Sequence, residues 1–262
     1  MTIESRYHLF DCFLDDPELG LDSGTSYFRD GKYKDVDAAS PRLYCCHELL
    51  WSGELPNGEN LRLVFCRESD NRFMLKDENF PLPLTSDTIS RSHSKLDNLL
   101  QSGVISKEEA NGYLRASRSI GSFLIWPIRG DKGNPWNTVN IVRARTVNDR
   151  IDLTLWHLKN CYEKNWGEDE RDELGKPIGL YKTFKLYRSW FELFKTFKGF
   201  VDFFHLQDFV NEGDYSVQLF AETIAIRMGS DLELKYVRWL LDKISARDEK
   251  LRTLFAYRQS FS

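Results

Sequence analysis

The sequence predicts an α+β fold in one domain, with a mixed half of short strands followed by a largely helical half. Short apolar runs bounded by turn residues, typical of strands, lie before residue 145. After residue 146, apolar residues recur every three to four positions, which is typical of helices. A chain of 262 residues with 41% hydrophobic and 29% charged residues can bury a large core. We therefore divide it into an irregular segment (1–35), a mixed part (36–145) and a mainly helical part (146–262).

The first elements of the mixed part are marked by turn signals. The run L-P-N-G at residues 55–58 predicts a tight turn, because Asn and Gly accept positive φ angles. Residues 61–66 and 72–76 are predicted strands, paired as a hairpin across residues 69–71. Residues 41–51 fit a helix or a strand, and the pattern does not choose between them.

The rest of the mixed part combines helices with a second pair of strands. Residues 89–100 carry apolar side chains at helical spacing, and Ser106 with Glu109 forms a capping box that opens the next helix. The apolar run at residues 123–126 predicts a buried strand, and residues 139–142 are its expected partner.

The helical part contains four predicted helices. The first covers residues 151–162, with Asn148 or Asp149 as its cap, and two aromatic-rich helices follow at residues 184–194 and 200–210. We interpret the aromatic stripe of these helices as core rather than as a base-stacking surface. The last helix is long and begins at a second capping box, and its apolar seam is Leu234, Val237, Leu241 and Ile244.

Charge and cysteine content exclude several classes of protein. The net charge of −4 argues against a generally basic nucleic-acid or membrane binder, although a local basic patch stays open. Five cysteines, an odd number without a C-x-x-C motif, do not form a disulfide framework or a zinc site of four thiolates. No apolar run approaches the ~20 residues that span a bilayer, and no secretory signal is recognisable. We expect a cytoplasmic protein without membrane association.

The common nucleotide, dinucleotide, hydrolase and zinc-protease motifs are absent from the sequence, and no cofactor is identified. Asp202, His205 and Asp208 lie at three-residue steps, which spread them over about 120° of a helix surface. We interpret them as a solvated polar face rather than a metal site.

The strongest candidate for chemistry is a group of polar residues around position 145. Arg143 and Arg150 offer bidentate donors, and the start of a helix offers free backbone N–H groups for an anion. We expect these arginines to clamp the anion, with Asn140 and Asp149 beside them and His47 contacting or protonating the ligand. The alternative is structural: Asp149 caps the helix and Arg150 pairs with a nearby acid such as Asp152.

Five segments, taken together and in their order along the chain, resemble those of a known family. They are S-P-R-L at 40–43 with His47, L-W-S at 50–52 and L-P-N-G at 55–58; S-D-T-I at 86–89; S-I-G at 119–121 with Asn140 and Arg143; D-R-I-D-L-T-L at 149–155; and F-K-G-F-V-D-F-F at 197–204 with Gln207, Asp208 and Tyr215. Together they resemble, over residues 35–220, a family of bacterial proteins known only as a domain of unknown function. The resemblance implies a cytoplasmic bacterial protein and brings no activity or cofactor. The five candidate residues fall inside these segments, which favours a shared cleft.

Three functions stay open from the sequence. The first is binding of an anionic small molecule, such as a nucleotide or phosphorylated compound, in a polar cleft. The second is an enzyme acting on nucleic acid, such as a nuclease, with His47 as general acid or base. The third is a non-catalytic interaction protein, oligomeric or with another partner, that uses the seam of its C-terminal helix.

Overall fold

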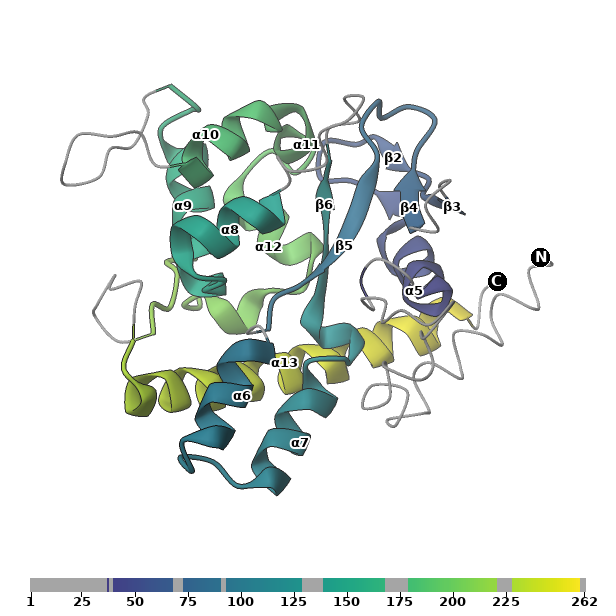
Figure 1. The fold of residues 1–262 in the computed structure, drawn as a ribbon. Coiled ribbons are helices and arrows are strands. Elements are labelled where there is room, and N and C mark those ends of the chain that lie inside the picture. Colours follow the sequence, from purple (N-terminus) through teal and green to yellow (C-terminus); the bar gives the residue numbers. More distant parts are fainter. Residues whose placement is uncertain are drawn as a thin grey trace.

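The computed structural model describes residue 37 and residues 40–67, 73–90, 93–128, 139–167, 179–220 and 228–259 (Figure 1). The predicted irregular segment 1–35 lies outside these ranges. The named strands lie before residue 128, and the described chain from residue 139 onward is built mainly of helices. The fold is therefore α+β, as the sequence predicts. None of the helices in the described ranges has the length and apolarity needed to cross a bilayer.

The strands form two antiparallel sheets. A four-stranded sheet has the order β3 (Val64–Arg67), β4 (Phe73–Lys76), β5 (Leu84–Thr88) and β6 (Phe123–Pro127). A small hairpin pairs β1 (Gly53–Glu54) with β2 (Asn60–Leu61), and the L-P-N-G run forms its turn. The predicted hairpin of 61–66 with 72–76 is confirmed as β3 with β4, although residue 61 belongs to β2 and the predicted turn at 69–71 lies outside the described residues. The buried strand predicted at 123–126 is confirmed as β6.

The predicted strand at residues 139–142 is wrong. These residues begin helix α8 (Val139–Val147), which buries Val139, Arg143 and Val147 at four-residue spacing. The partner of β6 is β5, whose Ser86 lies opposite Ile125. Strand β5 cannot be recognised from the sequence, because its polar side chains are buried and hydrogen-bonded rather than exposed. The strand therefore shows no alternation of apolar and polar residues.

Two helices of the mixed part, α5 and α7, begin at recognisable caps. Residues 41–51 form helix α5 (Pro41–Trp51), with Pro41 in the first turn, and the Ser40 hydroxyl accepts a hydrogen bond from the backbone N–H of Leu43 (3.1 Å). Helices α6 (His93–Gln101) and α7 (Lys107–Ala116) follow. The predicted capping box before α7 is confirmed, because Ser106 and Glu109 each accept a hydrogen bond from the other's backbone N–H at 3.1 Å.

The second half is helical but is divided differently from the prediction. The N-cap position of helix α9 (Ile151–Glu163) is Arg150 rather than Asn148 or Asp149, and its side chain makes no capping hydrogen bond. Both predicted caps instead have positive φ angles, 52° and 58°, and make the sharp turn between α8 and α9. The aromatic segments form three short helices, α10 (Gly179–Leu186), α11 (Arg188–Glu192) and α12 (Phe197–Phe203), before the long helix α13 (Ser230–Gln259).

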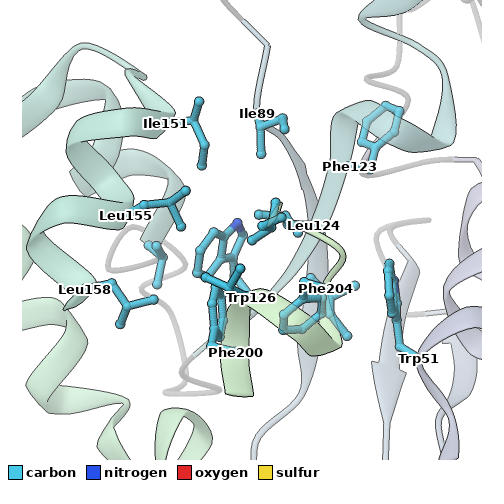
Figure 2. Packing of buried hydrophobic residues seen from close by; sticks show 14 of the residues in the cluster. Trp51, Ile89, Phe123, Leu124, Trp126, Ile151, Leu155, Leu158, Phe200 and Phe204 are labelled. Atoms are coloured by element: carbon cyan, nitrogen blue, oxygen red, sulfur yellow. The ribbon is translucent and has the colours of Figure 1, made fainter. Parts of the chain in front are cut away.

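The aromatic helices pack on β6 and form the core. Trp126 of β6 lies against Phe200 of α12, with ring centroids 6.0 Å apart, and Leu155 and Leu158 of α9 are close by (Figure 2). The interpretation of the aromatic stripe as core is confirmed, because Phe184 and its aromatic neighbours are fully buried.

Helix α13 runs across the lower part of the view in Figure 1, above the ends of α6 and α7, and contacts α5, α7 and the short 3₁₀ turns at residues 120–122 and 207–209. A Cβ atom on Gly121 would lie 2.5 Å from the Ile244 carbonyl oxygen, so only glycine permits this close approach. The N-terminal half of α13 packs on α6 and α7 through Leu234, Val237 and Leu241. The same chain therefore buries Val237 and covers part of Leu234 and Leu241.

Candidate functional site

His47 is fully buried in α5 and is held by two hydrogen bonds. Its Nδ1 accepts from the indole N–H of Trp51 (2.8 Å), and its Nε2 lies 2.8 Å from the Ser86 hydroxyl. Because an indole can only donate, Nδ1 carries no proton, and the neutral ring donates its Nε2–H to Ser86. Burial, and after it the charge of Arg247, lowers the pKa of His47 to about 3. The imidazole therefore stays neutral near pH 7 and has no contact with solvent.

Arg143 is also fully buried, and its guanidinium group is used within the fold. It pairs with the carboxylate of Asp87 and donates to the Thr88 carbonyl oxygen (3.3 Å) at the end of β5. It further donates to the Thr154 hydroxyl (3.2 Å) and to the Asp149 carbonyl oxygen (3.4 Å). These bonds fix α8 to the sheet and to the start of α9.

Arg150 has a similar structural environment. Its guanidinium pairs with Asp152, and both side chains have 0% exposure. The same group donates to the Phe220 carbonyl oxygen (3.1 Å) and lies 5.6 Å from the ring centroid of Tyr236. The structural alternative for Arg150, a pair with Asp152, is thus what the structure shows.

The five predicted residues do not line one cleft. Ser86 and Asp87 are consecutive in β5, so their side chains point to opposite faces of the sheet. His47 binds Ser86 from the α5 side, and Arg143 binds Asp87 from the α8 side (Figure 1). Asn140 lies in α8, and its buried Oδ1 accepts no hydrogen bond from the described residues. The sheet therefore separates His47 from the other four residues, which gather around α8 and its turn into α9.

An open cleft of about 580 Å³ lies elsewhere, between the β1–β2 turn and the α11–α12 turn. We call its apolar lining the floor (Leu55, Pro56, Phe194 and Phe203) and its charged lining the rim (Glu54, Lys195, Lys198 and Asp202); Thr196 and Gly199 also line it. Of the floor residues, Leu55 and Phe194 are buried.

One rim of the cleft is fixed by a tight, strained turn. The Thr196 N–H donates to the Phe194 carbonyl oxygen (2.6 Å), and Lys195 between them has a φ of 61°. This is the rare γ-turn that has a positive central φ. The Thr196 hydroxyl then accepts from the Gly199 N–H (3.0 Å) and caps α12. A Cβ atom on Gly199 would lie 2.1 Å from the Phe194 carbonyl oxygen, so the turn requires glycine there.

The second lysine belongs to a polar network on α12. Lys198 pairs with Asp202, which also accepts from the Tyr215 hydroxyl (2.9 Å) and from the Gln207 amide (3.1 Å). The hydrogen bond to Asp202 raises the pKa of Lys198 to about 12. Burial raises the pKa of Asp202, but the hydrogen bonds from Lys198, Tyr215 and Gln207 outweigh it and hold this pKa below its ordinary value. Both groups are therefore ionised at neutral pH.

Sequence reasoning set Lys195 aside with the aromatic stripe that it interpreted as core, and it missed Lys198 as a site residue. A signal for this region was present, because L-P-N-G at 55–58 and F-K-G-F-V-D-F-F at 197–204 are two of the segments that carry the family resemblance. Both contribute residues to the cleft. Their proximity depends on the packing of the β1–β2 turn against α12, where Pro56 lies over Gly199, and no local pattern encodes that contact.

Comparison with known proteins gives one match. Residues 21–251 match a protein family described as "Family of unknown function (DUF6994)". No curated protein and no solved structure matches the chain.

Proposed function

Because the chain belongs to the family of unknown function DUF6994, whose description names no activity, we propose a function from the geometry of the cleft. The protein binds a small ligand with an anionic group, such as a nucleotide or another phosphorylated compound, between the β1–β2 turn and the α11–α12 turn. Lys195 meets the anionic group, Lys198 stays paired with Asp202 beside it, and the apolar floor meets the body of the ligand. We also propose that the protein is bacterial and works in the cytoplasm, as expected from the sequence.

The observation that carries this proposal is the position of Lys195. Its side chain is exposed on the rim and has no hydrogen-bond or ion-pair partner among the described residues. The strained turn and the requirement for Gly199 fix the backbone that carries it. Strained backbone is often retained where it positions a functional group. The cleft volume is also within the range of about 300–1,000 Å³ that small-molecule sites occupy.

The electrostatics of the cleft favour binding over acid–base catalysis. A general acid or base works best when its pKa lies near the operating pH. Lys198 and Asp202 are shifted the other way, toward their charged forms. They can attract or orient charged groups but do not exchange protons readily near pH 7.

The two alternative functions receive less support. The nuclease hypothesis assigned acid–base work to His47, and that ring is fully buried with a strongly lowered pKa. The interaction hypothesis used the seam of α13, and Leu234, Val237 and Leu241 of that seam pack against α6 and α7.

The test is a binding assay with the full chain and three probes: inorganic pyrophosphate, AMP and hexyl phosphate. Saturation at about 100 Kd is expected to stabilise the protein by about 2.7 kcal/mol, which a thermal-shift assay detects, and calorimetry then gives Kd. Lys195→Ala is expected to weaken binding about tenfold, or ~1.4 kcal/mol. Lys182→Ala, which removes the same charge from an exposed position on α10, leaves Kd unchanged.

Two results would contradict the proposal. One is the absence of a thermal shift with all three probes. The other is equal affinity of a probe for wild type and Lys195→Ala, because the ligand would then bind without the lysine that defines the site.

A further inference from the structure

The charges around the cleft are balanced, and one of each sign is left unpaired. Lys198 and Asp202 neutralise each other directly. Lys195 and Glu54 are both exposed on the rim, and neither side chain has a hydrogen-bond or ion-pair partner among the described residues. The cleft therefore offers a ligand one unpaired cation and one unpaired carboxylate.

We infer that the ligand is a dipolar ion, with an anionic group that pairs with Lys195 and an ammonium group that pairs with Glu54. This inference rests on the proposed function, because it assigns the second charge of the same ligand. It names the chemical class as an amine-bearing phosphate or carboxylate whose two charges are joined by an apolar segment.

Charge repulsion is the reason that a purely anionic ligand fits the cleft less well. Such a ligand gains an attraction to Lys195 but also lies in the field of the unpaired Glu54 carboxylate. An ammonium group on the ligand changes that repulsion into an attraction. Binding sites commonly gain specificity by combining a favourable contact for the right partner with repulsion of the wrong one.

The apolar floor explains what joins the two charges. Pro56 is exposed and Phe203 is partly buried, so these two residues give the floor its water-accessible apolar surface. A methylene spacer can cover this floor while its two ends reach the rim, and covering the floor removes apolar surface from water. A fully polar ligand leaves the same surface hydrated and gains nothing from it.

The experiment compares ω-aminoalkyl phosphates of two to six carbons with the alkyl phosphates of the same lengths, which differ only by the ammonium group. For wild type, calorimetry is expected to give about tenfold tighter binding of the amino compound at the best-fitting length. Glu54→Gln is expected to abolish that advantage by weakening only the amino compounds. Lys195→Ala weakens both series, and Glu212→Gln, an exposed acid outside the cleft lining, changes neither.

The outcomes separate this inference from the proposed function. If alkyl phosphates bind wild type as tightly as their amino counterparts, or if the advantage persists in Glu54→Gln, the dipolar ligand is wrong and anion binding stands. If neither series binds and pyrophosphate and AMP also fail, the proposed function falls and the inference falls with it.

Discussion

Two regions of the molecule present basic side chains near a helix start, and they use them in opposite ways. Around the α8–α9 turn, Arg143 and Arg150 are fully buried against carboxylates. At the α11–α12 turn, Lys195 is exposed without a partner among the described residues, and Lys198 pairs with Asp202 at the surface. In the first region the fold supplies a carboxylate for each arginine, whereas in the second the described residues supply one for Lys198 and none for Lys195. The four predictions below test this contrast.

The largest expected effect is on the buried pair. Asp152→Ala leaves the Arg150 guanidinium buried without its carboxylate and removes the acceptor of the Phe220 N–H, so the free energy of unfolding should fall by about 3–5 kcal/mol. Lys198→Ala should have a much smaller effect, because its pair with Asp202 is exposed and screened by water. Urea denaturation measures both. Similar losses in the two variants would abolish the distinction between the two regions.

Replacing glycine by alanine tests the contrast between the protein interior and the cleft. Gly121→Ala places a Cβ against the backbone of α13, and the strain should cost about 2–3 kcal/mol. Gly199→Ala should clash with the Phe194 carbonyl oxygen and move the turn that carries the exposed Lys195, so this variant should also bind ligand more weakly. Gly112→Ala, in α7 with no atom within 4 Å of the added Cβ, should stabilise the protein by up to about 1 kcal/mol. A Gly121→Ala variant as stable as wild type would rule out the close contact.

The pH dependence of stability distinguishes the buried histidine from the charged cleft. The pKa of His47 is about 3 in the folded protein against 6.5 as its ordinary value, so the unfolded chain binds a proton at a higher pH than the folded one. The stability that depends on neutral His47 is complete above about pH 6.5 and declines as the pH falls toward 3. Between pH 7 and pH 5 the loss should be about 2 kcal/mol.

His47→Gln should remove most of this slope, because an amide can bond to Ser86 and Trp51 without titrating. Denaturation of both proteins at pH 7 and pH 5 gives the comparison. Parallel losses in wild type and variant would show that His47 is not the group responsible.

The smallest effect concerns the strained turn. Lys195→Gly should raise the free energy of unfolding by roughly 0.5–1 kcal/mol, because glycine adopts a φ of 61° without a steric cost. The same change should weaken binding of the phosphate probes as Lys195→Ala does. Lys182→Gly, in the interior of α10, should instead destabilise the protein by about 1 kcal/mol. A Lys195→Gly variant that binds normally would remove this lysine from the site.

Local patterns predict the fold of this chain better than its candidate site. The Ser106–Glu109 capping box and the strand at 123–127 depend on residues near in sequence, and both are present. Strand β5 was missed because its buried hydroxyl and carboxylate groups find partners far along the chain, such as His47 and Arg143. The cleft has the same origin, since its walls lie some 140 positions apart, at residues 54–56 and 194–203.

One guanidinium group connects the earliest described helix to the latest. Arg258, in the last turn of α13, donates to the carbonyl oxygens of Leu49, Leu50 and Ser52 at the end of α5 (2.7–2.9 Å). A ribosome makes these carbonyls about 200 residues before it makes the arginine that satisfies them. During synthesis the end of α5 must therefore rely on water, and that part of the native structure can close only after α13 has emerged.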